Sequence, residues 1–255
     1  MLTIGLLHEM SSVATADYYR RINDGVNELL GGHERAQVLL WSVNFGDIER
    51  FVRGNRWDAA AHYLTKRALA LQEAGADFVM CGSNTMHRVA PTIEAALDVP
   101  FLHIVDAVAD EANARGLRTL GVLGTLPTME AGFYRDRYAR HGLDVLTPDG
   151  EDRRLVDRII FDELTRNKFT DGSRQKYLRV IRQLEAAGAD AVVLGCTEIG
   201  LLVEQADLPH LPLLDTTVLH VERAVRLALG HEPLPVAAPT AAAPTTSPTT
   251  ATDAG

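Results

Sequence analysis

The chain has 255 residues, of which 46% are hydrophobic and 23% are charged, and its net charge is −9. This composition is that of a globular protein with enough apolar material for the core of one large or two small domains. The acidic balance and the lack of a long Lys/Arg run argue against nucleic-acid binding, and two cysteines in so long a chain argue against a disulfide scaffold.

The N-terminal segment reads Met-Leu-Thr-Ile-Gly-Leu-Leu-His-Glu. It has no basic region and no small-residue cleavage site, so we do not expect a signal peptide. No apolar run approaches the ~20 residues that a membrane span needs. We therefore expect a cytoplasmic protein that associates with no membrane.

Short apolar runs alternate along the chain with segments in which apolar residues recur at helical spacing. The runs predict buried strands at 3–7, 37–43, 77–82, 101–104, 119–123, 145–147 and 190–195. The helical spacing predicts helices around 14–30, 64–71, 155–160 and 177–184. Strands that alternate with helices are typical of parallel sheets covered by helices on both faces.

The C-terminal segment has a different composition. From Pro233 onward the chain is almost wholly Ala, Pro and Thr, without periodicity. Such a segment cannot bury enough apolar surface to compensate for the entropy lost on ordering. We expect residues 231–255 to form a disordered tail.

One ten-residue stretch occurs twice. Residues 74–83 read Ala-Gly-Ala-Asp-Phe-Val-Met-Cys-Gly-Ser, and residues 187–196 read Ala-Gly-Ala-Asp-Ala-Val-Val-Leu-Gly-Cys, with six identical positions. A looser similarity relates 4–7 to 120–123, each followed by an aromatic pair. The repeat predicts an α/β fold of two pseudo-symmetric lobes, each a doubly wound parallel sheet.

The duplication gives expected lobe boundaries. We expect the first lobe to span residues 1–105 together with about 213–230, and the second lobe to span 106–212. Ser83 and Cys196 occupy the same position of the repeat, just past the C-terminal end of a predicted strand, where ligands bind in open α/β sheets. We therefore expect them to face each other across an active site between the lobes.

Two facing groups can move a proton off one face of a carbon and onto the other, one acting as base and one as acid. A thiol suits both roles because its pKa of ~8.5 lies near neutrality and falls at a helix N-terminus. Cys196 is expected at a strand-to-helix corner. There, backbone N–H groups and the helix dipole would stabilise a thiolate and a substrate carboxylate.

The residues around both positions resemble two signatures of the aspartate/glutamate racemase superfamily. Gly195-Cys196-Thr197-Glu198 is similar to the second signature. Ser83-Asn84-Thr85-Met86-His87 is similar to the first, whose common form is Cys-Asn-Thr followed shortly by His. The match covers roughly residues 1–230 and extends through Met10, Thr15, Val43-Asn44-Phe45, the segment 100–104, Asp215 and His220.

The resemblance implies an isomerase: an amino-acid racemase that acts on aspartate, glutamate or a related amino acid with neither pyridoxal phosphate nor a metal, often as a homodimer. It implies that Cys196 and Ser83 are the catalytic pair. Asn84, Thr85 and Thr197 would bind the α-carboxylate, and a basic residue near Arg166 or Lys168 would bind a side-chain carboxylate. The substrate-binding set implied in this way is Met10, Thr15, Asn84, Thr85, Thr197, Glu198, Arg166 and Lys168.

The chain departs from the family pattern in two places. Ser83 stands where the first cysteine is common, and a hydroxyl is a far poorer base than a thiol. Because the second-half cysteine of the family addresses the L-isomer, we expect an L-amino acid to be preferred. His8-Glu9 stands where the first loop commonly has Gly-Gly. The larger side chains of His8 and Glu9 would narrow the pocket, or their charge would repel a dicarboxylic substrate.

Each of these residues also has a purely structural interpretation. Ser83 could be a helix N-cap, Cys196 a buried structural thiol, Glu198 a first-turn helix carboxylate, and Arg166 and Lys168 surface charges. Two rival functions stay open as well. A single-cysteine decarboxylase of the same superfamily would release carbon dioxide, and a catalytically impaired amino-acid-binding protein would bind its ligand without isotope exchange.

Overall fold

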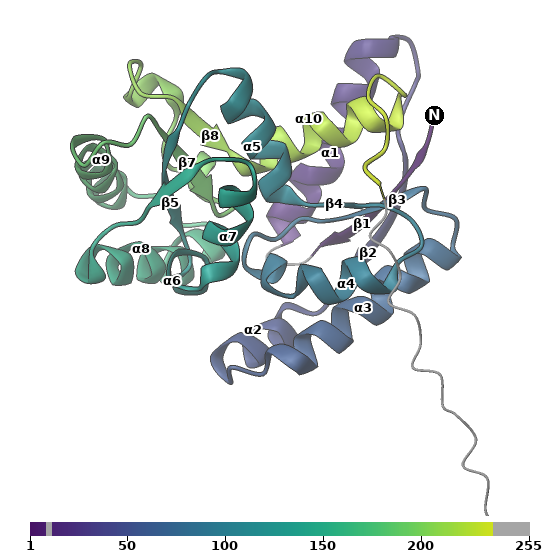
Figure 1. Ribbon diagram of the computed structural model, residues 1–255, viewed down its shortest axis with the longest axis horizontal. Helices are drawn as coiled ribbons and strands as arrows, with labels where there is room; N and C mark the ends of the chain where they lie inside the picture. Colours follow the sequence, from purple (N-terminus) through teal and green to yellow (C-terminus); the bar gives the residue numbers. More distant parts are fainter. Residues whose placement is uncertain (9–11, 237–255) are drawn as a thin grey trace, which may run out of the picture.

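The computed structural model describes residues 1–8 and 12–236, so most of the expected tail lies outside the described residues. Two four-stranded parallel sheets lie side by side, each with helices on both faces (Figure 1). This confirms the predicted α/β fold of two lobes. No helix among the described residues has the length and apolar character needed to cross a membrane.

The two sheets share one strand order. The first has the order β2-β1-β3-β4 and the second has the order β6-β5-β7-β8. The strands of the first sheet are β1 (Thr3–His8), β2 (Gln37–Ser42), β3 (Phe78–Cys81) and β4 (Phe101–Leu102). Those of the second are β5 (Thr119–Gly124), β6 (Asp144–Leu146), β7 (Ala191–Gly195) and β8 (Leu213–Asp215).

Ten α-helices connect and cover the strands in the described part of the chain. They are α1 (Ser12–Leu30), α2 (Phe45–Arg53), α3 (Trp57–Glu73), α4 (Ala90–Ala96), α5 (Ile104–Ala114), α6 (Leu126–Glu130), α7 (Gly132–Arg140), α8 (Gly150–Asp162), α9 (Asp171–Ala186) and α10 (Thr216–Ala228). Short 3₁₀ helices are η1 (Thr85–Val89), η2 (Leu164–Arg166), η3 (Ile199–Leu201) and η4 (Gln205–Asp207).

The central strands of each sheet are buried on both faces. Successive side chains of a strand point to opposite faces, so Val192 and Leu194 of β7 pack with α8 and α9, while Ala191 and Val193 pack with α5 and α7. The near-continuous apolar runs that predicted these strands follow from this double burial.

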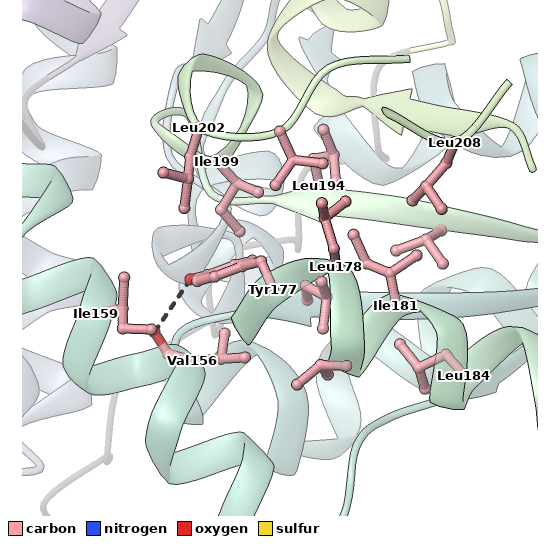
Figure 2. Packing of buried hydrophobic residues seen from close by; sticks show 14 of the residues in the cluster. Val156, Ile159, Tyr177, Leu178, Ile181, Leu184, Leu194, Ile199, Leu202 and Leu208 are labelled. Carbon is pink, nitrogen blue, oxygen red and sulfur yellow. Dashed lines mark hydrogen bonds between the residues drawn. The ribbon is translucent and has the colours of Figure 1, made fainter. Parts of the chain in front are cut away.

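Figure 2 shows the cluster between the second sheet and α8 and α9. Leu178 and Ile181 of α9 pack toward Leu194 of β7. The buried Tyr177 hydroxyl donates a hydrogen bond to the Val156 carbonyl of α8 at 3.1 Å, which satisfies the one polar group of this side chain.

The repeated Ala-Gly-Ala-Asp sequence has a structural basis. Gly75 and Gly188 follow the ends of α3 and α9 with φ angles of +100° and +102°, a backbone conformation that glycine adopts without steric penalty. The carboxylates of Asp77 and Asp190 then accept the backbone N–H of the first residue of β1, at 2.6 Å, and of β5, at 2.8 Å. The repeat therefore ends a helix and ties its lobe's third strand to its first.

The structure differs from the expected elements in three places. The strand expected to be buried over 37–43 is the edge strand β2, whose residues are half-buried or exposed. The strand expected over 101–104 ends at Leu102, because the His103 ring accepts the backbone N–H of Val105 and begins α5. The segment 213–230, which we expected in the first lobe, begins with β8 of the second sheet. It continues as α10, which packs on α1 of the first lobe through Val221 and Ala224.

Candidate active site

Loops that follow β3, β5 and β7 meet at a cavity of about 30 Å³ between the lobes. Carboxyl ends of parallel strands are the usual ligand-binding edge of an α/β sheet. The cavity is partly open to solvent, since several of its lining residues, Cys196 among them, are only half-buried. It is lined by Phe45, Ser83, Asn84, Thr85, Thr125, Ile160, Phe161, Thr165, Gly195, Cys196, Thr197 and Glu198.

Cys196 is paired with a carboxylate. Its thiol donates to Glu198 Oε2 at 3.1 Å, and the Thr197 hydroxyl donates to the same oxygen at 2.7 Å. Burial of the thiol, and then the neighbouring Glu198 carboxylate, raise the pKa of Cys196 well above its ordinary value. The resting residue is thus a protonated thiol, held beside a group that can accept its proton.

The expected lowering of the thiol pKa by a helix N-terminus is therefore wrong. Only the single 3₁₀ turn η3 follows Cys196, and it supplies no long helix dipole. The acidic partner and the loss of hydration outweigh the backbone N–H groups at this corner.

Ser83 is fully buried at the opposite loop. Its hydroxyl accepts the backbone N–H of Met86 at 3.4 Å, a long bond, at the start of η1. This long hydrogen bond gives only weak support to the interpretation of Ser83 as an N-cap. Ser83 also lines the cavity.

His87 holds the Ser83 loop in place. Its Nε2 accepts the backbone N–H of Ile104 at 3.1 Å, so its Nδ1 carries the proton and donates to the Ser83 carbonyl at 2.7 Å. Burial lowers the pKa of His87 to about 4, which keeps this tautomer neutral. His87 does not line the cavity, and we assign it a positioning role.

Asn84 links the two lobes. Its Oδ1 accepts the Tyr134 hydroxyl at 2.7 Å, and its Nδ2 donates to the Thr216 hydroxyl at 3.0 Å. That hydroxyl donates in turn to the Leu194 carbonyl at 2.9 Å, two residues before Cys196. The loop of Ser83 is thereby connected to the strand of Cys196.

Thr85 makes a second link between the lobes. Its hydroxyl lies 2.8 Å from that of Thr125 and 3.4 Å from that of Thr128, which are 3.2 Å apart. Each hydroxyl can donate and accept, so the cluster can turn a donor toward an anion in the cavity. Thr125 follows β5, and sequence analysis did not select it.

Several expected substrate contacts lie away from the cavity. The Thr15 hydroxyl lies 2.9 Å from His8 Nδ1, and Thr15 is not a lining residue. Arg166 and Lys168 are exposed, and neither lines the cavity; Met10 falls outside the described residues. The structure therefore does not place Arg166 or Lys168 as partners for a side-chain carboxylate.

His8 packs against the chain just before Ser83. A Cβ atom at Gly82 would come within 2.6 Å of His8 Nε2, so only glycine fits beneath the ring. The ring is buried, its pKa is lowered to about 3 by burial, and it does not line the cavity. Cys81 is likewise buried in the core cluster on β3.

Phe45, Ile160, Phe161 and Thr165 complete the lining, and sequence analysis did not assign them to a site. Ile160 and Phe161 lie in α8, whose periodicity indicates only that this helix has a buried face. Within residues 1–8 and 12–236, no group of three or more His, Cys, Asp or Glu side chains is arranged to hold a metal ion.

Comparison with known proteins gives consistent similarities. The sequence profile described as Asp/Glu/Hydantoin racemase matches residues 7–224. The chain is 25% identical over 237 residues to the broad specificity amino-acid racemase RacX of Bacillus subtilis, covering 90% of this chain and 99% of that one. Among solved structures, that of a candidate Asp/Glu racemase from Yersinia pestis is 44% identical in sequence to this chain and superposes on it with a TM-score of 0.84. PH1733 from Pyrococcus horikoshii, an aspartate racemase homologue, has 30% identity and a TM-score of 0.77; each structure is matched over 90% of this chain and 100% of its own.

Proposed function

This chain belongs to the Asp/Glu/hydantoin racemase family, and we propose that it racemises its amino acid by a cofactor-independent two-base proton transfer between Cys196 and Ser83. The observation that carries the proposal is that these two residues, from matching loops of the two lobes, line one cavity. The substrate is aspartate, glutamate or a related amino acid, and the enzyme is a cytoplasmic homodimer.

The reaction begins at Cys196. Its thiol proton passes to Glu198, which already accepts it in a hydrogen bond. The thiolate then removes the α-proton of the L-isomer, which leaves a carbanion whose charge spreads into the α-carboxylate. Ser83 delivers its hydroxyl proton to the opposite face, which gives the D-isomer. The serine alkoxide then takes a proton from water, and Glu198 gives the proton that it took from Cys196 to the hydroxide that remains, which restores all three residues.

The substrate carboxylate is held by polar groups that line the cavity. Thr85 and Thr125 offer hydroxyl donors, and Asn84 has a second amide N–H besides the one bound to Thr216, whereas the Thr197 hydroxyl already donates to Glu198. Hydrogen bonds from these groups would strengthen as charge moves onto the carboxylate, which lowers the barrier to proton removal.

The proposal is tested by incubating the protein with L-amino acids in deuterium oxide and following the α-carbon by NMR. We expect α-deuterium incorporation and growth of the D-isomer, and Cys196→Ser should reduce both by ~10²–10⁴-fold. Cys81→Ser is the matched control, since the only other cysteine lies in the core away from the cavity. Carbon dioxide release would indicate a decarboxylase, and saturable binding without exchange would indicate a binding protein; either result contradicts the proposal.

A further inference from the structure

The residues that line the cavity are of two kinds. Loop residues after β3, β5 and β7 carry hydroxyl, amide, thiol and carboxylate groups. Two helices contribute apolar side chains, which are Phe45 at the start of α2 and Ile160 and Phe161 near the end of α8. An amino acid has the same division between its polar α-carbon groups and its side chain.

On the basis of the proposed function, we propose that the substrate side chain carries no negative charge and packs against the Phe45, Ile160 and Phe161 wall. The reacting α-carbon has to lie between Ser83 and Cys196, among the polar groups. The side chain is then left to contact the apolar residues of the lining, where burial of apolar surface is favourable and burial of an unpaired carboxylate is strongly unfavourable.

The charge of the site argues in the same direction. Glu198 is the one charged residue among the lining residues in the described part of the chain, and its carboxylate is buried beside Cys196. A dicarboxylic substrate would bring its side-chain carboxylate into this space in addition to Glu198 and the α-carboxylate that every amino acid carries. Like charges within a few ångströms repel strongly at low effective dielectric constant.

A longer side chain would meet no net positive charge further out. A neighbouring cavity of about 380 Å³ shares Phe45, Thr85 and Phe161 with the first. Three carboxylates and two guanidinium groups line it, and the Arg53 guanidinium is already paired with Glu49 at 2.8 Å. This neighbouring cavity is large enough for an extended side chain, but its charged residues give no preference for a negatively charged side chain.

Amino acids of nearly equal size that differ only in side-chain charge test the effect of that charge on the rate. We expect the rate of α-deuterium exchange, expressed as kcat/KM, to be at least about tenfold higher for L-glutamine than for L-glutamate, and for L-asparagine than for L-aspartate. L-Leucine and L-methionine should also exchange faster than either acid. Faster exchange of glutamate or aspartate would overturn the inference but leave the racemase proposal intact. Absence of exchange with every amino acid would instead contradict the racemase proposal.

A variant tests whether electrostatic repulsion causes the expected preference for glutamine over glutamate. Thr165→Lys places a cation at the cavity edge and should raise kcat/KM for glutamate relative to glutamine by about tenfold, whereas Thr165→Gln, similar in length but uncharged, should leave that ratio unchanged. The ratio is measured within one variant, so a partial loss of folding cancels. An equal glutamate-to-glutamine ratio in the two variants would count against an electrostatic origin.

Discussion

At Cys196 a buried carboxylate is the nearest charged group, whereas backbone N–H groups and a helix dipole were expected to act on the thiol. Glu198 accepts hydrogen bonds from both Cys196 and Thr197, and it contributes to the raised pKa of the thiol. If Glu198 only orients the thiol, any side chain that accepts the same hydrogen bond can replace it. If Glu198 also receives the thiol proton, its replacement has to be a base as well.

Glu198→Gln separates these roles. The amide oxygen can still accept the thiol hydrogen bond, but it cannot take the proton, so we expect kcat to fall by ~10²–10⁴-fold. Loss of the negative charge should also lower the pKa of Cys196, which a pH profile of iodoacetamide alkylation would record as a shift to lower pH. A shifted profile with unchanged kcat would exclude Glu198 as the proton acceptor.

At the scale of elements, the turns after α3 and α9 give the lobes their common form. Both turns contain a glycine at a positive φ angle, Gly75 and Gly188. Replacing either by alanine should lower the free energy of unfolding by about 1–2 kcal/mol, because a Cβ atom is strained in this conformation. Gly172→Ala, in the first turn of α9 with an ordinary φ angle, is the matched control and should be neutral or stabilising by urea denaturation. Equal stabilities of all three variants would refute a role for these turns.

The strands were largely predictable because burial on both faces leaves continuous apolar runs in the sequence. β8 was not, since Leu213–Asp215 is only three residues long and its place in the second sheet depends on pairing with β7. The repeat predicted that Ser83 and Cys196 would lie at one site, and both line the same cavity. Ile160 and Phe161 could not be assigned to that cavity, because helical periodicity does not distinguish a core contact from a cavity wall.

At the scale of the whole molecule, the lobes are joined beside the site by Asn84 and Thr85, which bond to Tyr134, Thr216 and Thr125. These hydrogen bonds hold the loop of Ser83 close to the second lobe at the cavity, and they would oppose any separation of the lobes there.

Buried neutral histidines should make the whole fold sensitive to acid. Burial lowers the pKa of His8 and His220 to about 3 and that of His87 to about 4, whereas unfolded histidine titrates near 6.5. The unfolded chain then binds more protons below pH 6.5, so stability is full above that pH and declines as the pH falls toward 4. Urea unfolding at a series of pH values should show this decline, and His33→Gln, at an exposed position, should leave its slope unchanged. Constant stability between pH 6.5 and 4 would contradict the prediction.

The two-base assignment is tested most directly by Ser83→Ala in deuterium oxide. Within residues 1–8 and 12–236 the serine hydroxyl makes one hydrogen bond, and it is long, so the fold should tolerate its loss. Cys196 can still remove the α-proton of an L-substrate and return a deuteron to the same face, so we expect α-deuterium exchange with retention of configuration and little D-isomer. Formation of the D-isomer by Ser83→Ala at the wild-type rate would show that another group donates the proton on the second face.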